Sequence, residues 1–328
     1  MARRLDTRQR AVLCQVLLLV ALCTAGWYFL TNVVDNLLSR RIASGFGFLW
    51  REAGFEIGES TLLSASAADS YLKALTVGLL NTFRVALLAS TLATLIGGTL
   101  GLARLAPNWL LAKIAAGYVE LLRNIPLVVQ LFFWYAVITE SLPAPAEALN
   151  PLPGFYLSNR GLAVPIIVTL LPLQIEHPTL NAFNFSGGVV LSPEFTALFL
   201  GLALYTAAFI GEIVRAGILA VDRGQYEAAQ AQGLSQGQIM RLIILPQALR
   251  LIVPPLTSQY LNCIKNSSLA VAIGYPDLVS IANTVINQTG QAIEGVAIIM
   301  LVYLTISLTI SAAMNFYNRR IALRGART

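Results

Sequence analysis

The sequence predicts an all-α integral membrane protein with about six transmembrane helices. Of its 328 residues, 56% are hydrophobic and only 12% are charged, whereas a soluble domain carries about 25% charged residues. The mean hydropathy is +0.70. Apolar runs of bilayer-crossing length, about 20 residues, recur along the chain between polar segments. The net charge of +6 does not indicate nucleic-acid binding, because the basic residues are scattered around the ends of the apolar runs.

The first predicted span is Ala11–Leu30, which a basic stretch precedes. A secretory signal peptide is the alternative, but its apolar region would be shorter, and no small-x-small cleavage site follows. We therefore expect an uncleaved span with the preceding arginines inside: Arg3, Arg4, Arg8 and Arg10. The polar segment Thr31–Tyr71 is expected outside, with short amphipathic pieces at the membrane surface. Residues 1–74 would thus form an N-terminal anchor and an external segment.

The second predicted span lies within Leu75–Leu105. Arg84 is near its external end, and we expect this side chain to reach outward to the interface. Gly97 and Gly101 either form a face for close helix contact or merely relieve crowding, and the sequence leaves both interpretations open.

The third predicted span, Ile114–Ile138, contains a proline. Pro126 frees a backbone carbonyl and is expected to kink the helix, as membrane proteins tolerate near a pathway. Glu120 and Arg123 are three residues apart on one helix face, so we expect them to pair.

A long segment, Ser141–Glu194, is rich in Pro, Gly and Asn, and we expect it to be a periplasmic loop. Its apolar run Val164–Leu173 is too short to cross a bilayer, and Pro165 and Pro172 interrupt it. We interpret this run as a surface or partly re-entrant piece.

The fourth predicted span is Phe195–Val214. Small residues recur along one face of it and favour close helix packing: Ala203, Ala207 and Gly211. Glu212 follows at its internal end, beside Arg215.

The stretch Asp222–Pro246 looks helical but is not apolar enough to span a bilayer. Asp222 suits a helix start, Gly233 suits a left-handed helix stop, and Ser235 begins the capping box of a second short helix. The local chemistry therefore predicts a helix, a glycine corner, a second helix, and then a span that begins at Pro246.

The same stretch resembles the EAA loop of ABC importer permeases. The pattern is EAA, three residues, Gly, nine residues, Ile, one residue, Leu-Pro, and the chain fits it without a gap. An ordinary amphipathic loop is the alternative, but a full match between spans disfavours it. The resemblance implies cytoplasmic coupling helices that dock in a groove of an ATPase subunit. The candidate coupling residues are Arg223, Glu227, Ala228, Ala229, Gly233, Ile243, Leu245 and Pro246.

The fifth predicted span, Gln247–Cys263, is expected to bend at Pro254 and Pro255. Polar residues then suggest a broken helix end of the kind that binds carboxylates: Lys265, Asn266, Ser267 and Ser268. An amino acid in transit needs a cationic or hydroxyl-rich spot and an acidic or carbonyl-rich one. Lys265, Ser267 and Ser268 are candidates for the first, and Glu212 is the candidate for the second. Alternatively, Lys265 reaches the interface and Glu212 pairs with Arg215.

The sixth predicted span, Val296–Phe316, follows a polar stretch, Asn283–Glu294, that we expect outside. Most of the 22 Lys and Arg residues lie in segments assigned to the inside. Both termini are therefore expected in the cytoplasm, with arginines in the tail: Arg319, Arg320, Arg324 and Arg327.

A second resemblance concerns the third span, whose ELLRNIPLVVQLFF stretch is similar to the polar-amino-acid (histidine/glutamine) branch of these permeases. The matching residues are Glu120, Leu121, Arg123, Pro126, Leu127, Gln130, Leu131, Phe132 and Phe133. The N-terminal region and the NFSGG-LSPEF stretch resemble the Q-type subunit of general L-amino-acid transporters. Members of that group often have a longer insertion with an extra pair of spans within 141–194, which this sequence lacks.

These resemblances imply a type I ABC importer permease core at residues 75–320, formed by the last five spans, and a cytoplasmic tail at 321–328. They also imply an ATPase pair, a second permease subunit, a periplasmic amino-acid-binding protein, a polar L-amino acid as substrate and a location in the lipid of the inner membrane.

Enzyme chemistry has no support in the sequence. It contains no phosphate-binding Gly-Lys-Ser/Thr loop, and its single His177 lies in a Pro-flanked polar loop, so no catalytic triad is credible. Cys14, Cys23 and Cys263 lack metal-ligand spacing and are interpreted as packing residues. We therefore expect no catalytic residue, cofactor or metal. A self-contained channel or ion-coupled carrier, or a membrane-anchored scaffold, is the alternative, but neither needs a docking loop.

Overall fold

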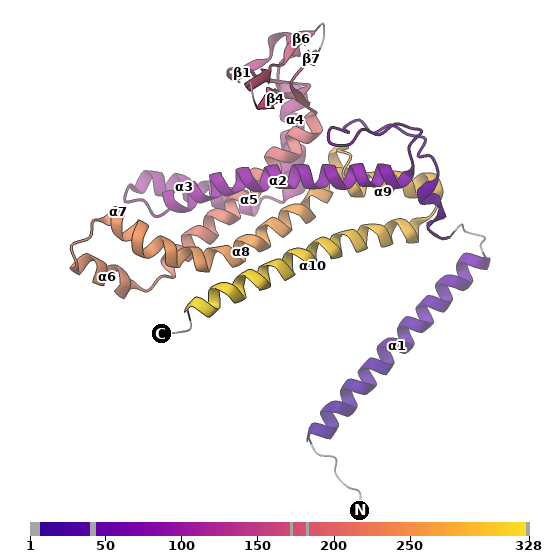
Figure 1. Ribbon diagram of the computed structural model, residues 1–328, viewed down its shortest axis with the longest axis horizontal. Helices are drawn as coiled ribbons and strands as arrows, with labels where there is room; N and C mark the ends of the chain where they lie inside the picture. The colour runs from indigo at the N-terminus through magenta and orange to yellow at the C-terminus, as the bar shows by residue number, and fades with distance from the viewer. Residues whose placement is uncertain (1–6, 40–43, 171–172, 182–183, 326–328) are drawn as a thin grey trace, which may run out of the picture.

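The computed structural model describes residues 7–39, 44–170, 173–181 and 184–325. Long helices form the body of the molecule, a small β domain lies beyond α4, and α1 stands apart (Figure 1). Among the described residues, five helices are long and apolar enough to cross a membrane, or six if one bent pair counts as a span. This confirms the predicted number of spans and the helical membrane fold.

Helix α1 (Thr7–Ser39) extends the predicted first span at both ends. None of its apolar stretch, Val12–Asn36, is buried within the protein, which suits a helix surrounded by lipid. Cys14 and Cys23 are exposed on it, so the packing role predicted for these two cysteines is wrong, whereas Cys263 is buried. Some predicted cytoplasmic residues, Arg3, Arg4 and the last residues of the tail, lie outside the described residues, as do the side chains of Arg8 and Arg10.

The segment after α1 packs on the helices through part of its apolar side chains. It contains a 3-10 helix, η1 (Phe46–Trp50). Phe48, Ala53 and Ile57 are buried in one cluster with apolar residues of α2 (Tyr71–Ala103) and α9 (Leu278–Thr289). Phe46 and Trp50 of η1 remain exposed, so the expectation that short amphipathic pieces of this segment lie at the membrane surface stays a prediction.

Helices α2 and α5 (Pro193–Leu219) form the central pair of the body. A Cβ at Gly97 would lie 2.7 Å from the Ile210 side chain, and one at Gly101 would lie 2.6 Å from that of Val214. The two glycines therefore let the backbones approach each other. Of the two open interpretations, close helix contact is confirmed.

The third span is broken rather than kinked. Helices α3 (Trp109–Asn124) and α4 (Leu127–Ala136) meet at an angle of 103°. Ile125 is extended because the ring of the following Pro126 disfavours helical geometry there. The Gln130 side-chain amide donates to the carbonyls of Leu122 and Ile125, at 2.9 and 3.1 Å, and so satisfies the groups that the break leaves free.

The segment predicted as a loop forms a β domain in its described part. It follows a π-helical turn, η2 (Val137–Ser141), and a 3-10 turn, η3 (Pro145–Glu147). The main sheet has the antiparallel order β1-β2-β3-β8, and the hairpins β4–β5 and β6–β7 are inserted between β3 and β8. The strands are β1 (Leu149–Leu152), β2 (Phe155–Ser158), β3 (Gly161–Val164), β4 (Ile166–Leu170), β5 (Leu173–Glu176), β6 (Thr179–Asn181), β7 (Asn184–Ser186) and β8 (Val189–Leu191).

The apolar run Val164–Leu173, predicted to be a surface or partly re-entrant piece, falls on β3, β4 and β5, apart from residues 171–172, which lie outside the described part of the chain. Strands of three to five residues are too short to show a clear two-residue alternation. Prolines such as Pro165 fall between strands, where a missing N–H breaks no ladder bond.

Helix α6 (Arg223–Ala231) is followed by one continuous helical path. The path comprises α7 (Gln236–Gln238), a π-helical stretch η4 (Ile239–Ile244), and α8 (Leu245–Asn266). The wider π turn lies directly before Pro246, whose missing N–H disturbs the regular ladder. The sequence predicts that the second short helix ends before a span that begins at Pro246. That prediction is wrong, because the two are joined in one helical path. Pro254 and Pro255 lie inside α8, and a 3-10 stretch, η5 (Ser267–Ile273), follows it.

Helix α9 replaces much of the stretch predicted to be external and polar, and α10 (Ala292–Gly325) provides the last span. Leu278, Ile281, Ala282 and Val285 are buried on α9, and their spacing is that of an amphipathic helix. The sequence therefore contains the apolar spacing of helix α9, but the polar residues on the other face of that helix led to the prediction of a polar segment.

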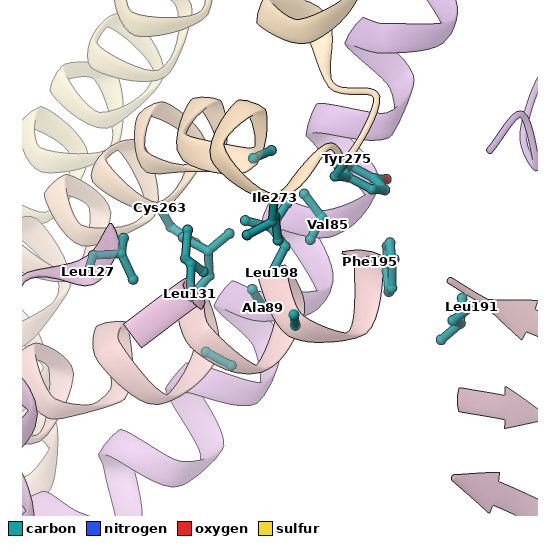
Figure 2. Packing of buried hydrophobic residues seen from close by; sticks show 14 of the residues in the cluster. Val85, Ala89, Leu127, Leu131, Leu191, Phe195, Leu198, Cys263, Ile273 and Tyr275 are labelled. Atoms are coloured by element: carbon teal, nitrogen blue, oxygen red, sulfur yellow. The ribbon is translucent and has the colours of Figure 1, made fainter. Parts of the chain in front are cut away.

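The largest buried cluster lies where α2, α4, α5 and the α8–η5 junction meet. Figure 2 shows Val85, Leu131, Leu198, Cys263 and Ile273 gathered there from segments far apart in the sequence. This core holds α2, α4, α5 and α8 together.

Candidate functional site

The α6–α7 corner is built by local hydrogen bonds. Gly233 has φ +80°, its N–H donates to the Gln230 carbonyl at 2.9 Å, and the Leu234 N–H donates to the Ala229 carbonyl at 3.3 Å. This is the Schellman arrangement, which ends a helix with a left-handed residue. The predicted glycine stop is therefore confirmed.

The second helix starts with the predicted capping box between Ser235 and Gln238, in which the Ser235 N–H donates to the Gln238 side chain at 2.9 Å. The Tyr226 hydroxyl also bonds the Gln236 side chain at 2.7 Å, which ties the two helices together across the corner. The connection between α6 and α7 is consequently a corner of defined geometry and not a flexible loop.

The EAA-type residues divide into an inward and an outward set. Ala229 is buried against Ile239 and Ile244, and Ile243 packs on the same cluster. Arg223 and Glu227 are exposed and lie 3.4 Å apart as an ion pair. The other outward-facing members are Ala228, Leu245 and Pro246. The inward set fixes the loop to α8, and the outward set leaves a free surface.

Glu212 lies in a cluster of arginines from three helices. Its carboxylate bonds Arg215 at 2.7 Å and Arg104, and Arg123 lies 4.0 Å away. Arg123 thus faces Glu212 rather than Glu120, and the pair predicted within α3 is not found among the described ion pairs. Both Glu212 oxygens are engaged, so this side chain offers no free carboxylate.

Lys265 lies at the predicted broken helix end, where α8 gives way to η5. Lys265 is exposed, whereas Ser267 is fully buried. The Ser267 and Ser268 hydroxyls each donate to a carbonyl one turn earlier, at 2.7 Å. Lys265 is 20 residues from the start of α8, about 30 Å along the helix. The structure does not bring Lys265 and Glu212 together, because Glu212 bonds Arg104 after the end of α2, whereas Cys263, two residues before Lys265, lies beside Ala86 in the middle of α2.

A second ionic cluster was missed by the sequence analysis. Arg84 does not reach outward as predicted but bonds Glu59 at 2.7 Å, and both side chains are about nine-tenths buried. The Ser192 hydroxyl donates to Glu59 at 2.6 Å, and the Arg84 guanidinium lies 4.5 Å from the centre of the Phe195 ring. Burial raises the pKa of Glu59, while the bonds from Ser192 and Arg84 oppose that change. The partners lie 25 and 133 residues apart in sequence, so no local pattern reveals them.

A polar cavity of about 480 Å³ adjoins this cluster. Glu59, Ser192 and Glu194 line it, together with Ser280 and Thr284 of α9. It lies beside the middle of α2, because Arg84, which holds Glu59, is halfway along that helix, whereas Arg104, which holds Glu212, follows its last residue.

The fold is that of an ABC importer permease. A solved structure described as an amino acid ABC transporter with histidines superposes with a TM-score of 0.57 at 28% identity, covering 76% of this chain and 95% of that one. Residues 90–323 match the model of binding-protein-dependent transport system inner membrane components. The chain belongs to this family.

Two relatives match almost the whole chain. A putative amino-acid ABC transporter permease protein of Escherichia coli (strain K12), YhdX, is 46% identical and covers 96% of this chain and 94% of its own length. The general L-amino acid transport system permease protein AapQ of Rhizobium johnstonii is 42% identical, covering 97% and 94%. The first alignment extends over 373 residues, more than the 328 of this chain, so that relative contains segments with no counterpart here.

Family membership makes the chain a transporter permease with several membrane spans. It decides against the self-contained channel, the ion-coupled carrier and the scaffold. The resemblance that the EAA-type spacing and the third span indicated is confirmed.

Proposed function

We propose that this chain is the permease subunit of an ATP-driven importer that moves polar L-amino acids across the inner membrane. The observation that carries the proposal is the α6–α7 corner. Its two helices are locked to each other by Tyr226 and Gln236, and α7 continues through η4 into α8 without a break. A push on the exposed surface of α6 would therefore reach a membrane helix directly. The amino-acid substrate is supported by what the relatives are named to transport.

In this proposal, an ATPase pair binds the outward surface formed by Arg223, Glu227 and Ala228. A second permease subunit faces this one across the pathway, and a periplasmic binding protein delivers the substrate. The α6–α7 corner and both termini lie in the cytoplasm, and the β domain lies in the periplasm.

For the substrate, Lys265 with Ser267 and Ser268 is the proposed carboxylate contact at the far end of α8. Glu212 was the candidate for the ammonium group, but its oxygens are engaged by Arg104 and Arg215.

The test is co-purification of the tagged chain with its ATPase, followed by amino-acid uptake. Glu227→Arg reverses an exposed charge on the proposed docking surface and is expected to abolish co-purification and uptake. Glu56→Arg makes the same change at the other end of the body and is the matched control for co-purification. Retention of the ATPase by Glu227→Arg at the wild-type level would refute the docking surface.

A further inference from the structure

The Glu212 cluster has more positive than negative charge. Arg104, Arg123 and Arg215 surround one carboxylate, and no other acidic side chain pairs with these arginines in the described part of the chain. Two positive charges are left without a counter-ion. Charges in a partly buried site are costly unless they are paired, so this arrangement favours an added anion.

The cluster also has unused donors. Each guanidinium carries five N–H donors, yet Arg104 and Arg215 each have one hydrogen bond to Glu212. The Nε of Arg215 is buried and has no partner. Arg123, 41% exposed, approaches Glu212 only at ion-pair distance and stacks 5.1 Å from the Phe209 ring centre. Guanidinium forks match the oxygens of a phosphate in pairs.

The position of the cluster indicates where the anion comes from. Arg104 directly follows α2 (Tyr71–Ala103), which is long and apolar enough to cross a membrane. The Glu212 cluster therefore lies where a membrane span ends, at the level of lipid head groups. Exposed leucines next to the arginines, Leu102 and Leu121, would lie among acyl chains just below the head groups.

We infer that Arg104, Arg123 and Arg215 form a binding site for the head-group phosphate of an anionic phospholipid. Glu212 holds two of the guanidiniums in place, and Arg123 closes the site from α3. Basic pockets between membrane helices at an interface suit such head groups. The inference does not depend on which substrate the protein carries.

The test is native mass spectrometry of the purified full chain with equal amounts of phosphatidylglycerol and phosphatidylcholine of the same acyl length. Wild type should retain phosphatidylglycerol about tenfold more than phosphatidylcholine, the ratio expected from one or two charged hydrogen bonds. Arg123→Gln should bring that ratio close to one. Arg123→Lys keeps the charge but loses the fork, and should keep part of the preference. Arg241→Gln removes an exposed arginine near the same end of the body and should leave the ratio unchanged.

Three results would overturn the inference: an equal preference in wild type, an equal loss in Arg241→Gln and Arg123→Gln, or full competition by a free anion. Millimolar inorganic phosphate that displaces the lipid would assign the site to a soluble anion. L-glutamate that displaces it would make the cluster a substrate contact.

Discussion

Gly233 is the residue of the α6–α7 corner whose backbone restricts the choice of side chain. At φ +80°, a β-branched residue is strained by roughly 1–2 kcal/mol. We expect Gly233→Val to insert in the membrane at normal abundance but to separate ATP hydrolysis from uptake, because the corner that transmits movement is distorted. ATPase and uptake rates of the reconstituted complex measure this effect.

Gly237 provides the control for that substitution. It lies in α7, and a Cβ there would meet no atom within 4 Å. Gly237→Ala should therefore keep wild-type coupling. Wild-type uptake by Gly233→Val at normal abundance would show that the corner geometry does not matter.

Asp277 predicts a pH dependence of stability. The residue is fully buried and caps α9, and burial raises its pKa from 3.8 to about 7. Between pH 4 and 7 the folded state holds a proton that the unfolded state has released. Stability should therefore fall as pH rises through this window, by roughly 1.4 kcal/mol per pH unit at most, and level off above pH 7.

The measurement for Asp277 is thermal unfolding in detergent across pH 4–8, compared between wild type and Asp277→Asn. Asparagine also caps helices but does not titrate, so the difference between the two curves isolates this carboxyl. Asp222→Asn, an exposed cap on α6, is the control. A difference curve that stays flat from pH 4 to 7 would mean that the buried carboxyl does not titrate there.

At the scale of single residues, the sequence predicts the features that depend only on residues close together in the chain. The Gly233 stop and the Ser235–Gln238 box depend on residues within one or two helical turns, and both are confirmed. Arg84 was expected to reach outward and Arg123 to pair with Glu120, and both expectations are wrong because the actual partners, Glu59 and Glu212, come from other elements. Only the packing of the whole chain brings those groups together.

The contact between α2 and α5 makes a quantitative prediction. A side chain at Gly101 would collide with Val214, whereas one at Gly98 would meet nothing within 4 Å. Gly101→Val should destabilise the protein by about 1–3 kcal/mol relative to Gly98→Val. Both variants make the same change in one helix, so the difference in their melting temperatures reports the contact alone. Equal melting temperatures would contradict the close approach.

Elements were predicted well where a long apolar period dominates and poorly where it does not. The long apolar helices were anticipated from length and hydropathy. The β domain was missed because its strands have three to five residues. Helix α9 was missed although its apolar spacing was regular, because polar residues on its other face outweighed that stripe.

The whole molecule has two distinct ends. Helix α9 packs against the first part of α2, with the Arg84–Glu59 cluster and the polar cavity near the middle of that helix, and the Glu212 cluster lies at its other end. The α6–α7 corner belongs with the second end, since α6 follows directly after α5.

This two-ended arrangement predicts the topology. Single cysteines in a cysteine-free background at Gly58, Gly187, Ser235 and Thr328 should divide into two classes by their reaction with a membrane-impermeant thiol reagent. Gly58 lies in the segment that packs on α9, and Gly187, in the β domain, precedes the start of α5, so both should react from the periplasm. Ser235 lies in the α6–α7 corner. Thr328 is the last residue, and the span α10 separates it from the first end. Both cysteines should react only after the cells are opened. The basic residues near the second end favour this orientation. Reaction of Ser235→Cys from outside would place the corner out of reach of any ATPase and remove the basis of the proposed coupling.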